Sequence, residues 1–404
     1  MRKSALFFFG LVVTALVALG LVVLSSASEA NATRLHGDNL FFMKRQFIYL
    51  AGGVLVAVCT ALFDYRRWRE NWILTALFYG VVFVLLLLVF NYPAINGSRR
   101  WIDLGFLRLQ PSEFAKLVTV VAVAVWLDKA GWRVELFKRG AMMSSVLIGA
   151  LTLPILLEPD FGSVMVVASA GALMMLVAGV RILHIVPFAA VGLGVLVYKV
   201  ATNANRMARI AAFVGVTAGG APEATTSDAG AAPGGAKVVL SAEDEATKRA
   251  DYQANQALVA IHNGGVWGVG LRESMQKQLY LPEAHTDFVF AIGAEELGVF
   301  FSAAVITLFS LFFGLAVYIS RKASDRLGRF LALGMSFLIY FQAMFNLGVV
   351  CKALPTKGMA LPFFSYGGTN LLSAFFAVGT ILSVGIHSYR DRKRRVPNKV
   401  LMRS

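Results

Sequence analysis

Long uncharged runs of apolar residues constrain this chain more than any other feature. The clearest are Ala5–Leu24, Ile73–Phe90 and Ala141–Leu157. A helix needs about 20 predominantly apolar residues to cross the hydrocarbon core of a bilayer. The runs therefore predict an all-α integral membrane protein, with a single polytopic membrane domain over residues 1–404.

Composition leads to the same fold class. Hydrophobic residues make up 57% of the chain and charged residues 15%, which is more apolar side chain than a soluble core of this length buries. Arg2 and Lys3 before the first run would also suit a signal peptide, but the run is longer than the roughly 7 to 15 residues of such a core. We interpret it as a first membrane span.

The net charge of +15 raises the question of a nucleic-acid partner. The positive residues are spread through short loops between the apolar runs, which is typical of membrane topology, so no nucleic acid is expected. Cys59 and Cys351 are expected at different depths, and no disulfide is predicted.

Ten membrane helices are predicted. Their ranges are 5–25, 47–63, 72–91, 112–128, 141–157, 162–180, 183–200, 286–315, 330–350 and 369–388. Basic clusters around Arg66, Lys138 and Arg321, and in the tail 389–404, mark the cytoplasmic side by the positive-inside rule. Both termini are then cytoplasmic.

The remaining segments are expected on the outer face, and 201–285 is the largest of them. Its part 214–250 is dominated by Ala, Gly, Pro and Thr, which predicts a flexible loop. Outer segments also carry Arg45, Arg100 and Lys357 against the topological preference. These charges have either a functional role or a contact with lipid headgroups.

The segment QPSEFAKL at 110–117 opens a predicted helix. Ser112 is expected to cap it, and Glu113 and Lys116 share one helical face. They form either a structural ion pair, or an arrangement in which Lys116 contacts a phosphate, because an ionisable group at membrane depth faces a cavity or a partner.

Two further segments have a structural and a functional interpretation. In EPDFGS at 158–163, Asp160 is expected to cap the next helix, and Glu158 adds a second carboxylate. In 252–270, a stretch containing Gln253 leads into several glycines, which allow close backbone approach. This segment either cradles a ligand or makes a tight re-entrant turn.

The segment LPEAHTDF at 281–288 places a carboxylate at the outer end of a predicted helix. Partial shielding from water suits Asp287 to accept a proton, which makes it the candidate general base. The alternative is that Asp287 caps the helix together with Thr286. Glu295 and Glu296, further along, are expected to be buried structural acids.

The segment LPTKGMALPFFSYGG at 354–368 joins the last two predicted helices. Irregular backbone at membrane depth survives only where protein or a water-filled cavity satisfies it. The segment is expected to line a site, with Lys357 and Ser365 available to it, and the alternative is a plain re-entrant connector.

Taken together, these segments resemble one family. NGSRRWIDLG, QPSEFAKL, EPDFGS, YQANQALVAI, LPEAHTDF with AEELG, and LPTKGMALPFFSYGG occur in the order and spacing of the FtsW, RodA and SpoVE family, the SEDS (shape, elongation, division, sporulation) proteins. The resemblance covers nearly the whole chain. LPEAHTDF, and Asn96-Gly97 before the arginines, look more like the division members than the elongation members.

The resemblance implies a ten-helix SEDS fold in the bacterial inner membrane. It implies polymerisation of lipid II into glycan strands at the outer face of the division septum, together with a class B penicillin-binding protein (an FtsI-like transpeptidase) and other divisome proteins. A lipid II flippase, an elongation polymerase and an inactive scaffold are the alternatives. A base confined to the outer mouth suits catalysis, whereas transport needs polar groups along a through-path.

The resemblance also assigns roles. The acid of the HTDF motif is the essential catalytic residue of the family, which here is Asp287. Attack by the acceptor's 4-hydroxyl on C1 of the donor expels undecaprenyl pyrophosphate and inverts the anomeric centre in one step. A divalent cation (Mg²⁺ or Mn²⁺) or basic side chains would neutralise the leaving group, and no other cofactor is expected. The residues expected at the substrate are Arg45, Arg100, Lys116, Lys357, His285 and Ser365, supported by Glu113, Glu158, Asp160 and Gln253.

The chain departs from the family pattern in several places. The loop 214–250 is longer than expected, and Ala257 stands where Ser is common. Lys352 replaces a common Gly, and Asn370 follows Thr369 where two serines are common. Lys352 adds a charge near the proposed site, and the long loop bears on how partners would dock.

Overall fold

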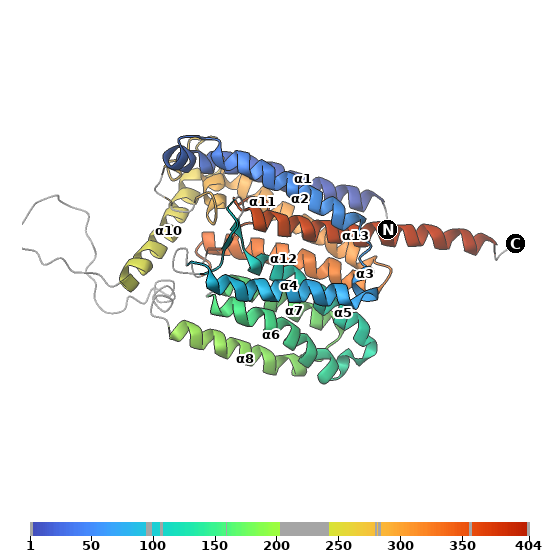
Figure 1. The fold of residues 1–404 in the computed structure, drawn as a ribbon. Helices are drawn as coiled ribbons and strands as arrows, with labels where there is room; N and C mark the ends of the chain where they lie inside the picture. The colour runs from blue at the N-terminus through green and yellow to red at the C-terminus, as the bar shows by residue number, and fades with distance from the viewer. Residues whose placement is uncertain are drawn as a thin grey trace, which may run out of the picture.

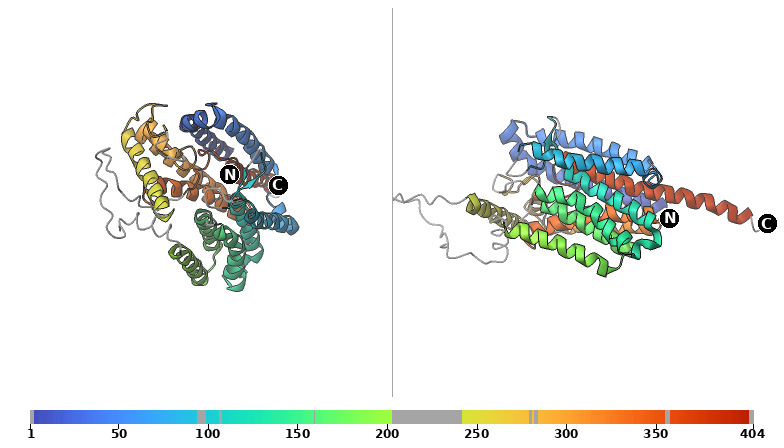
Figure 2. Two further views of the ribbon diagram at one scale, coloured as in Figure 1. Left: turned by 60° about the vertical axis from the view of Figure 1, so that its left-hand side comes forward. Right: turned by 60° about the horizontal axis from the view of Figure 1, so that its bottom comes forward.

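The computed structural model describes residues 3–93, 99–105, 108–158, 160–202, 242–278, 281, 284–354 and 358–401. Its long helices run side by side as one bundle (Figures 1 and 2). Among the described residues, nine helices are long and apolar enough to cross a membrane. They are α1 (Lys3–His36), α2 (Phe41–Leu62), α4 (Trp72–Leu88), α6 (Met143–Leu157), α7 (Phe161–Ala178), α8 (Ile182–Ala201), α11 (Val289–Arg321), α12 (Arg326–Val350) and α13 (Gly368–Leu401).

The predicted helix 112–128 corresponds to α5 (Pro111–Ala130), which is less apolar than the other nine. It carries ionisable residues near both ends, and most of its length is buried. It packs against α4, α6, α7 and α12, so these neighbours shield its charged groups from lipid. All ten predicted helices are therefore present, and the predicted all-α membrane fold is confirmed.

Several smaller elements complete the chain. They are α3 (Arg67–Glu70), the 3₁₀ helices η1 (Val89–Asn91) and η2 (Gly131–Glu135), the π-helical turn η3 (Lys138–Met142), strands β1 (Ile102–Asp103) and β2 (Arg108–Leu109), and α10 (Ala242–Gly264). The strands form an antiparallel hairpin in which Ile102 pairs with Leu109. The sequence did not predict this hairpin, because two-residue strands leave no periodicity to detect.

Helix α10 corrects one prediction. Residues 242–250 were expected to belong to the flexible loop, yet they form the first turns of α10, in keeping with the high helix propensity of Ala, Glu, Lys and Arg. The rest of that loop, 214–241, lies outside the described residues.

The most extensive helix packing in the described part of the bundle is between α2 and α13. At Gly379 a Cβ would come 1.8 Å from Thr60 Oγ1, so the missing side chain lets these helices approach. Large apolar side chains on the outside of the bundle are exposed, among them Leu55, Leu77 and Leu183. They are the surface that lipid would cover. Cys59 and Cys351 are free, as predicted.

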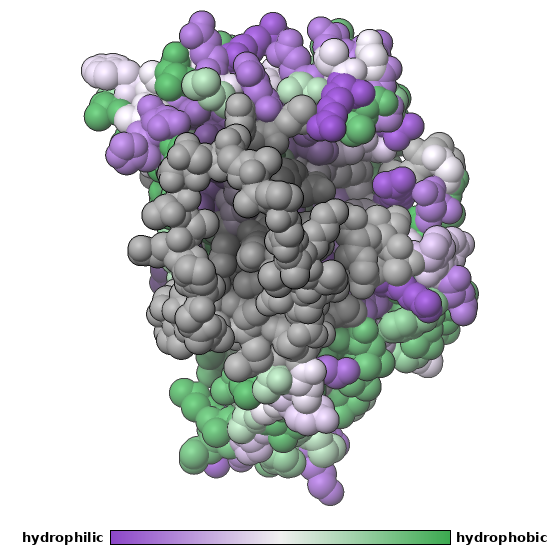
Figure 3. All heavy atoms as spheres, turned by 90° about the vertical axis from the view of Figure 1, so that its left-hand side faces the viewer, coloured by the Kyte–Doolittle hydropathy of each residue, from purple (hydrophilic) through white to green (hydrophobic). Residues whose placement is uncertain are grey.

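The two ends of the bundle differ. The N-terminus and the end of α13 lie at one end, where α13 runs on as a helix through the predicted basic tail (Figure 1). The opposite end carries α10 and the starts of α5, α7 and α13. Hydrophilic residues gather on the upper part of that face and hydrophobic ones along its lower edge (Figure 3). The candidate site lies at this second end.

Candidate active site

A cavity of about 290 Å³ lies between the start of α5, the start of α7, the start of α13 and the turn before α11. Four of the residues predicted from the sequence line it: Arg100, Glu113, Asp160 and Asp287. Segment 358–367 forms another part of its wall, so this irregular stretch lines a cavity, as the sequence predicted for it.

Asp287 lies in the turn that precedes α11. The N-cap position of α11 belongs to Phe288, so the alternative interpretation of Asp287 as the helix cap is wrong. Asn346 Nδ2 donates to the backbone oxygen of Asp287 over 2.9 Å and to that of Met359 over 2.6 Å. One buried amide of α12 thus joins the turn to the opposite wall of the cavity that Asp287 lines.

Ser365 and His285 support this turn. Ser365 Oγ donates to the Thr286 backbone oxygen over 2.5 Å and accepts from the Leu361 N–H over 2.7 Å. The Tyr366 N–H donates to the His285 oxygen over 3.0 Å. The His285 ring lies 4.8 Å from that of Phe42, and its Nδ1 is 3.3 Å from Asn31 Nδ2 on α1. Both residues fix the backbone beside Asp287, and neither lines the cavity.

A break in α11 anchors the segment that leads to Asp287. Gly298 has φ 70° inside the helix, which removes regular hydrogen bonds from the carbonyls before it. The N–H groups of Val269 and Gly270 donate to the oxygens of Glu295 and Glu296 over 3.0 and 3.1 Å. The glycine-rich segment is therefore packed on α11 as a tight turn, and Gln253 is half-buried on α10, away from the cavity lining.

The side chains of the two acids complete this anchor. Lys277 Nζ donates to Glu296 Oε1 over 3.0 Å and to Ser26 Oγ over 2.9 Å, and Ser274 Oγ donates to Glu295 Oε2. Each glutamate is 1% exposed. Glu295 and Glu296 are buried structural acids, as predicted, and they hold segment 274–277 against α1 and α11.

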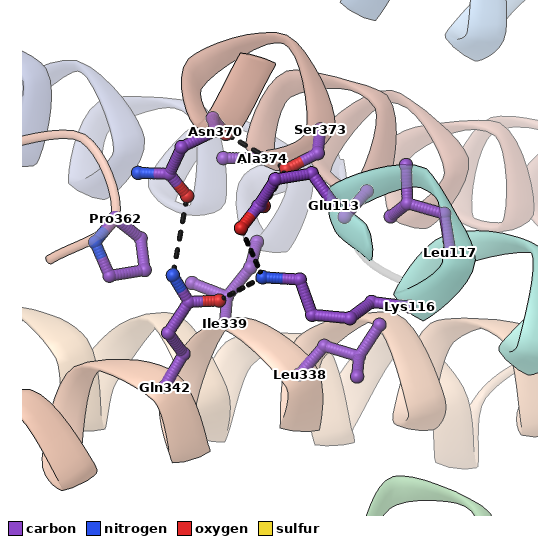
Figure 4. A pocket seen from close by; sticks show the side chains of 11 residues that line it. Glu113, Lys116, Leu117, Leu338, Ile339, Gln342, Pro362, Asn370, Ser373 and Ala374 are labelled. Atoms are coloured by element: carbon purple, nitrogen blue, oxygen red, sulfur yellow. Dashed lines mark hydrogen bonds and ion pairs between the residues drawn. The ribbon is translucent and has the colours of Figure 1, made fainter. Parts of the chain in front are cut away.

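Glu113 and Lys116 form a buried ion pair. Lys116 Nζ donates to Glu113 Oε1 over 2.8 Å and to Gln342 Oε1 over 2.6 Å, and Ser373 Oγ donates to Glu113 Oε2 over 2.9 Å (Figure 4). Lys116 is 4% exposed and borders a smaller cavity of about 20 Å³. The structure thus confirms the ion pair that was one of the two predicted alternatives. Lys116 does not line the larger cavity.

Asp160 and Ser112 meet at the ends of two helices. Asp160 is the N-cap of α7, as predicted, and accepts from the Ser163 N–H over 3.4 Å and from Ser163 Oγ over 2.6 Å. Ser112 was predicted to cap α5, but the N-cap position is Gln110 and it makes no side-chain cap hydrogen bond. The helix starts one residue earlier because Pro111 suits its first position, and Ser112 Oγ instead donates to Asp160 Oδ2 over 3.4 Å.

Glu158 is a buried acid at the turn after α6. It is 1% exposed, and neither carboxylate oxygen has a hydrogen-bond partner. Arg100 Nε donates to its backbone oxygen over 3.3 Å. Burial raises the pKa of Glu158 from 4.5 to about 8; nearby Asp160 adds to the rise and Arg100 opposes it. Glu158 is therefore largely protonated at neutral pH.

This predicts a pH-dependent stability. The folded chain holds the Glu158 proton to a higher pH than the unfolded chain does, so the stability it contributes is present below about pH 4.5 and is lost as the pH rises to about 8. As the pH rises from about 5 to about 9, we expect the melting temperature of Glu158→Gln to fall less than that of the wild type. Glu135→Gln, at an exposed ion pair, is the control. Parallel melting curves for wild type and Glu158→Gln would contradict the assignment.

Arg45 and Lys357 remain as predicted cations. Arg45 lies over the Phe41 ring at 4.7 Å and hydrogen-bonds Tyr366, so it reaches the cavity only through that tyrosine. Burial, with a contribution from Tyr49, raises the pKa of Tyr366 to about 12, and its hydroxyl stays protonated. Lys357 lies outside the described residues.

Sequence reasoning missed several lining residues. Trp101, Gln110, Tyr366, Thr369 and Asn370 also border the cavity. Each lies inside or directly beside a segment that the sequence singled out. The sequence therefore identified the segments that line the cavity, but it did not distinguish the neutral hydrogen-bonding residues within or beside them.

Gly358 lies directly against the candidate base. A Cβ on it would come 2.3 Å from Asp287 Oδ2, so Gly358→Ala must push the carboxylate aside. A displacement of about 1 Å from productive geometry costs about 100-fold in rate, and we expect a loss of that order with the protein still folded. Initial rates of the lipid II polymerisation that the sequence resemblance implies would measure it. Gly314→Ala, where a Cβ meets nothing within 4 Å, should keep full activity. Full activity of Gly358→Ala would remove Asp287 from the reacting geometry.

Known proteins resemble this chain in sequence and in fold. Residues 6–225 and 234–390 match the model of the FtsW, RodA and SpoVE family, described as cell cycle proteins. The probable peptidoglycan glycosyltransferase FtsW of Trichlorobacter lovleyi is 35% identical over 375 residues, which cover 93% of this chain and 91% of that protein. The rod shape determining protein RodA of Thermus thermophilus has a similar structure, with a TM-score of 0.62 and 25% identity over 95% of this chain and 97% of that one.

A chain of a peptidoglycan synthase complex, solved to describe the coordination of polymerization and crosslinking, has a TM-score of 0.66 at 23% identity. The match covers 95% of this chain and 98% of that one, and it shows that the two chains have the same fold. Family model, relatives and fold agree over nearly the full length. The chain belongs to the FtsW, RodA and SpoVE family.

Proposed function

We propose that this chain is a peptidoglycan glycosyltransferase that polymerises lipid II into glycan strands. The observation that carries the proposal is the Asp287 carboxylate, which lines a cavity between helix ends together with Arg100. Curated relatives at about 35% identity are named for the same activity.

In the proposed reaction, Asp287 accepts the proton of the acceptor's 4-hydroxyl. The oxygen attacks C1 of the donor sugar as the bond to undecaprenyl pyrophosphate breaks, so the electron pair leaves with the pyrophosphate. The α-linked donor gives a β-1,4 link through one inversion, and one base suffices. Arg100 is the described basic residue in the cavity lining that can balance the leaving charge.

A divalent cation is a second way to balance that charge. Mg²⁺ is commonly held by one or two carboxylates together with substrate phosphates, and Asp160 and Asp287 both line the cavity. Among the described residues no three His, Cys, Asp or Glu side chains gather as ligands. If an ion is bound, these two carboxylates would hold it together with the pyrophosphate, and it would stabilise negative charge there.

The place of action follows from the orientation of the bundle. The cavity lies at the end of the bundle opposite the N-terminus (Figure 1). The positive-inside rule predicts that the end with the two termini faces the cytoplasm. Catalysis then occurs at the extracytoplasmic face of the inner membrane. The similarity to relatives named FtsW supports a role in septal synthesis, and the fold shared with a synthase complex supports a class B penicillin-binding protein as partner.

The test is polymerisation of fluorescent lipid II by the purified chain in detergent, alone and with its class B partner. Detergent leaves no two compartments, so a transporter can give no product there. Glycan ladders on a gel are expected from the wild type. No ladder under either condition would refute the glycosyltransferase and favour the transporter or scaffold.

A further inference from the structure

Asn370, in the first turn of α13, has an amide that the proposed reaction leaves unused. Its side chain is 7% exposed, and it borders both the cavity that holds Asp287 and the smaller cavity beside Lys116. Its Nδ2 has no hydrogen-bond partner. A buried donor without an acceptor costs free energy, which points to an acceptor that arrives with a ligand.

The orientation of this amide follows from donor and acceptor chemistry. An ammonium group only donates, so the Gln342 atom 2.6 Å from Lys116 Nζ must be the oxygen. Gln342 Nε2 then donates to the Ala360 carbonyl over 2.8 Å and to Asn370 over 3.3 Å. The Asn370 atom that receives this bond must be Oδ1, and Nδ2 is left pointing away from Gln342 (Figure 4).

The start of α13 adds further donors. The first hydrogen bond of the helix runs from the Leu371 N–H to the Gly367 oxygen, so the N–H groups before Leu371 precede the helical ladder. Gly367, Thr369 and Asn370 all line the cavity. Free N–H groups and the positive end of the helix dipole favour an anion at such a position.

We propose that Asn370 Nδ2 and the first turn of α13 bind an oxygen of the leaving pyrophosphate, and that Lys116 sets the amide orientation through Gln342. The inference rests on the proposed glycosyltransferase function and adds a binding site to it. It gives the buried lysine an indirect role, because the charge of Lys116 fixes which atom Asn370 presents.

The test measures binding of undecaprenyl pyrophosphate, the product, to wild type, Asn370→Asp and Asn370→Ala. Asn370→Asp keeps the shape but replaces the donor with a charged acceptor, and Asn370→Ala removes the donor altogether. A lost hydrogen bond to a charged group corresponds to about 10- to 100-fold in affinity. We expect weakening of that order in both variants. Ser383→Ala, about 20 Å further along α13 and bonded to the Phe63 backbone oxygen, should bind as the wild type does.

Undecaprenol, which lacks the pyrophosphate, separates recognition of the anion from recognition of the lipid chain. Its binding should be equal in all variants. Unchanged binding of undecaprenyl pyrophosphate to both Asn370 variants, in a wild type that makes glycan, would overturn this inference alone. Failure of the wild type both to make glycan and to bind the product would overturn the proposed function with it.

Discussion

Asp287→Asn should lower the rate of lipid II polymerisation by about 100- to 10,000-fold, the usual contribution of a positioned general base. The amide has the shape of the carboxylate but cannot accept the proton. Because Phe288 and not Asp287 occupies the N-cap of α11, the substitution should leave the melting temperature unchanged. Initial rates of lipid II consumption and thermal unfolding of the same preparation measure both.

Asp38→Asn is a matched control for this variant. Asp38 is an exposed acid paired with Lys44 on the turn before α2, and its substitution should leave the rate intact. A folded Asp287→Asn protein that works at the wild-type rate would remove the base from the proposed reaction.

Lys116→Met should destabilise the fold by about 3–5 kcal/mol, because it leaves the Glu113 carboxylate buried without its cation. Glu113 is 5% exposed, and Ser373 supplies only one of its hydrogen bonds. The double variant Glu113→Gln/Lys116→Met removes both charges and should recover most of the lost stability. Thermal or denaturant unfolding in detergent measures the difference.

An exposed pair provides the comparison for Lys116→Met. Arg181→Met breaks the ion pair between Arg181 and Glu135, in which the two side chains are 65% and 60% exposed. Exposed ion pairs contribute about 0 to 1 kcal/mol to the free energy of unfolding. If the Lys116 single variant and the double variant lose the same stability, the cost does not come from an uncompensated charge.

The bundle could be predicted largely from the sequence. Nine helices follow from apolar runs, because in lipid the backbone must satisfy its own hydrogen bonds. Helix α5 was predicted despite its charges because the segment QPSEFAKL at 110–117 is typical of a helix start. The hairpin at Ile102 and Leu109 depends on pairing over too few residues to leave a pattern, and α10 begins inside a stretch whose overall composition suggests a loop.

The candidate site could be predicted only in part, and the reason is side-chain direction. Asp287 could be identified because a carboxylate at the outer end of an apolar helix is partly shielded from water and is suited to accept a proton. The sequence could not show that Ser365 and His285 turn toward the backbone of the Asp287 turn, or that Lys116 points to Gln342. These contacts join residues far apart in the chain, as does the series of hydrogen bonds that orients Asn370.

The configuration of the new glycosidic bond tests the central claim most directly. Glycan made by the purified wild-type chain from α-linked lipid II can be examined by nuclear magnetic resonance of its anomeric protons. One-step displacement with Asp287 as the base predicts β links throughout. Retained α links would contradict a single displacement, and the absence of any glycan in the presence of the class B partner would contradict the proposed function itself.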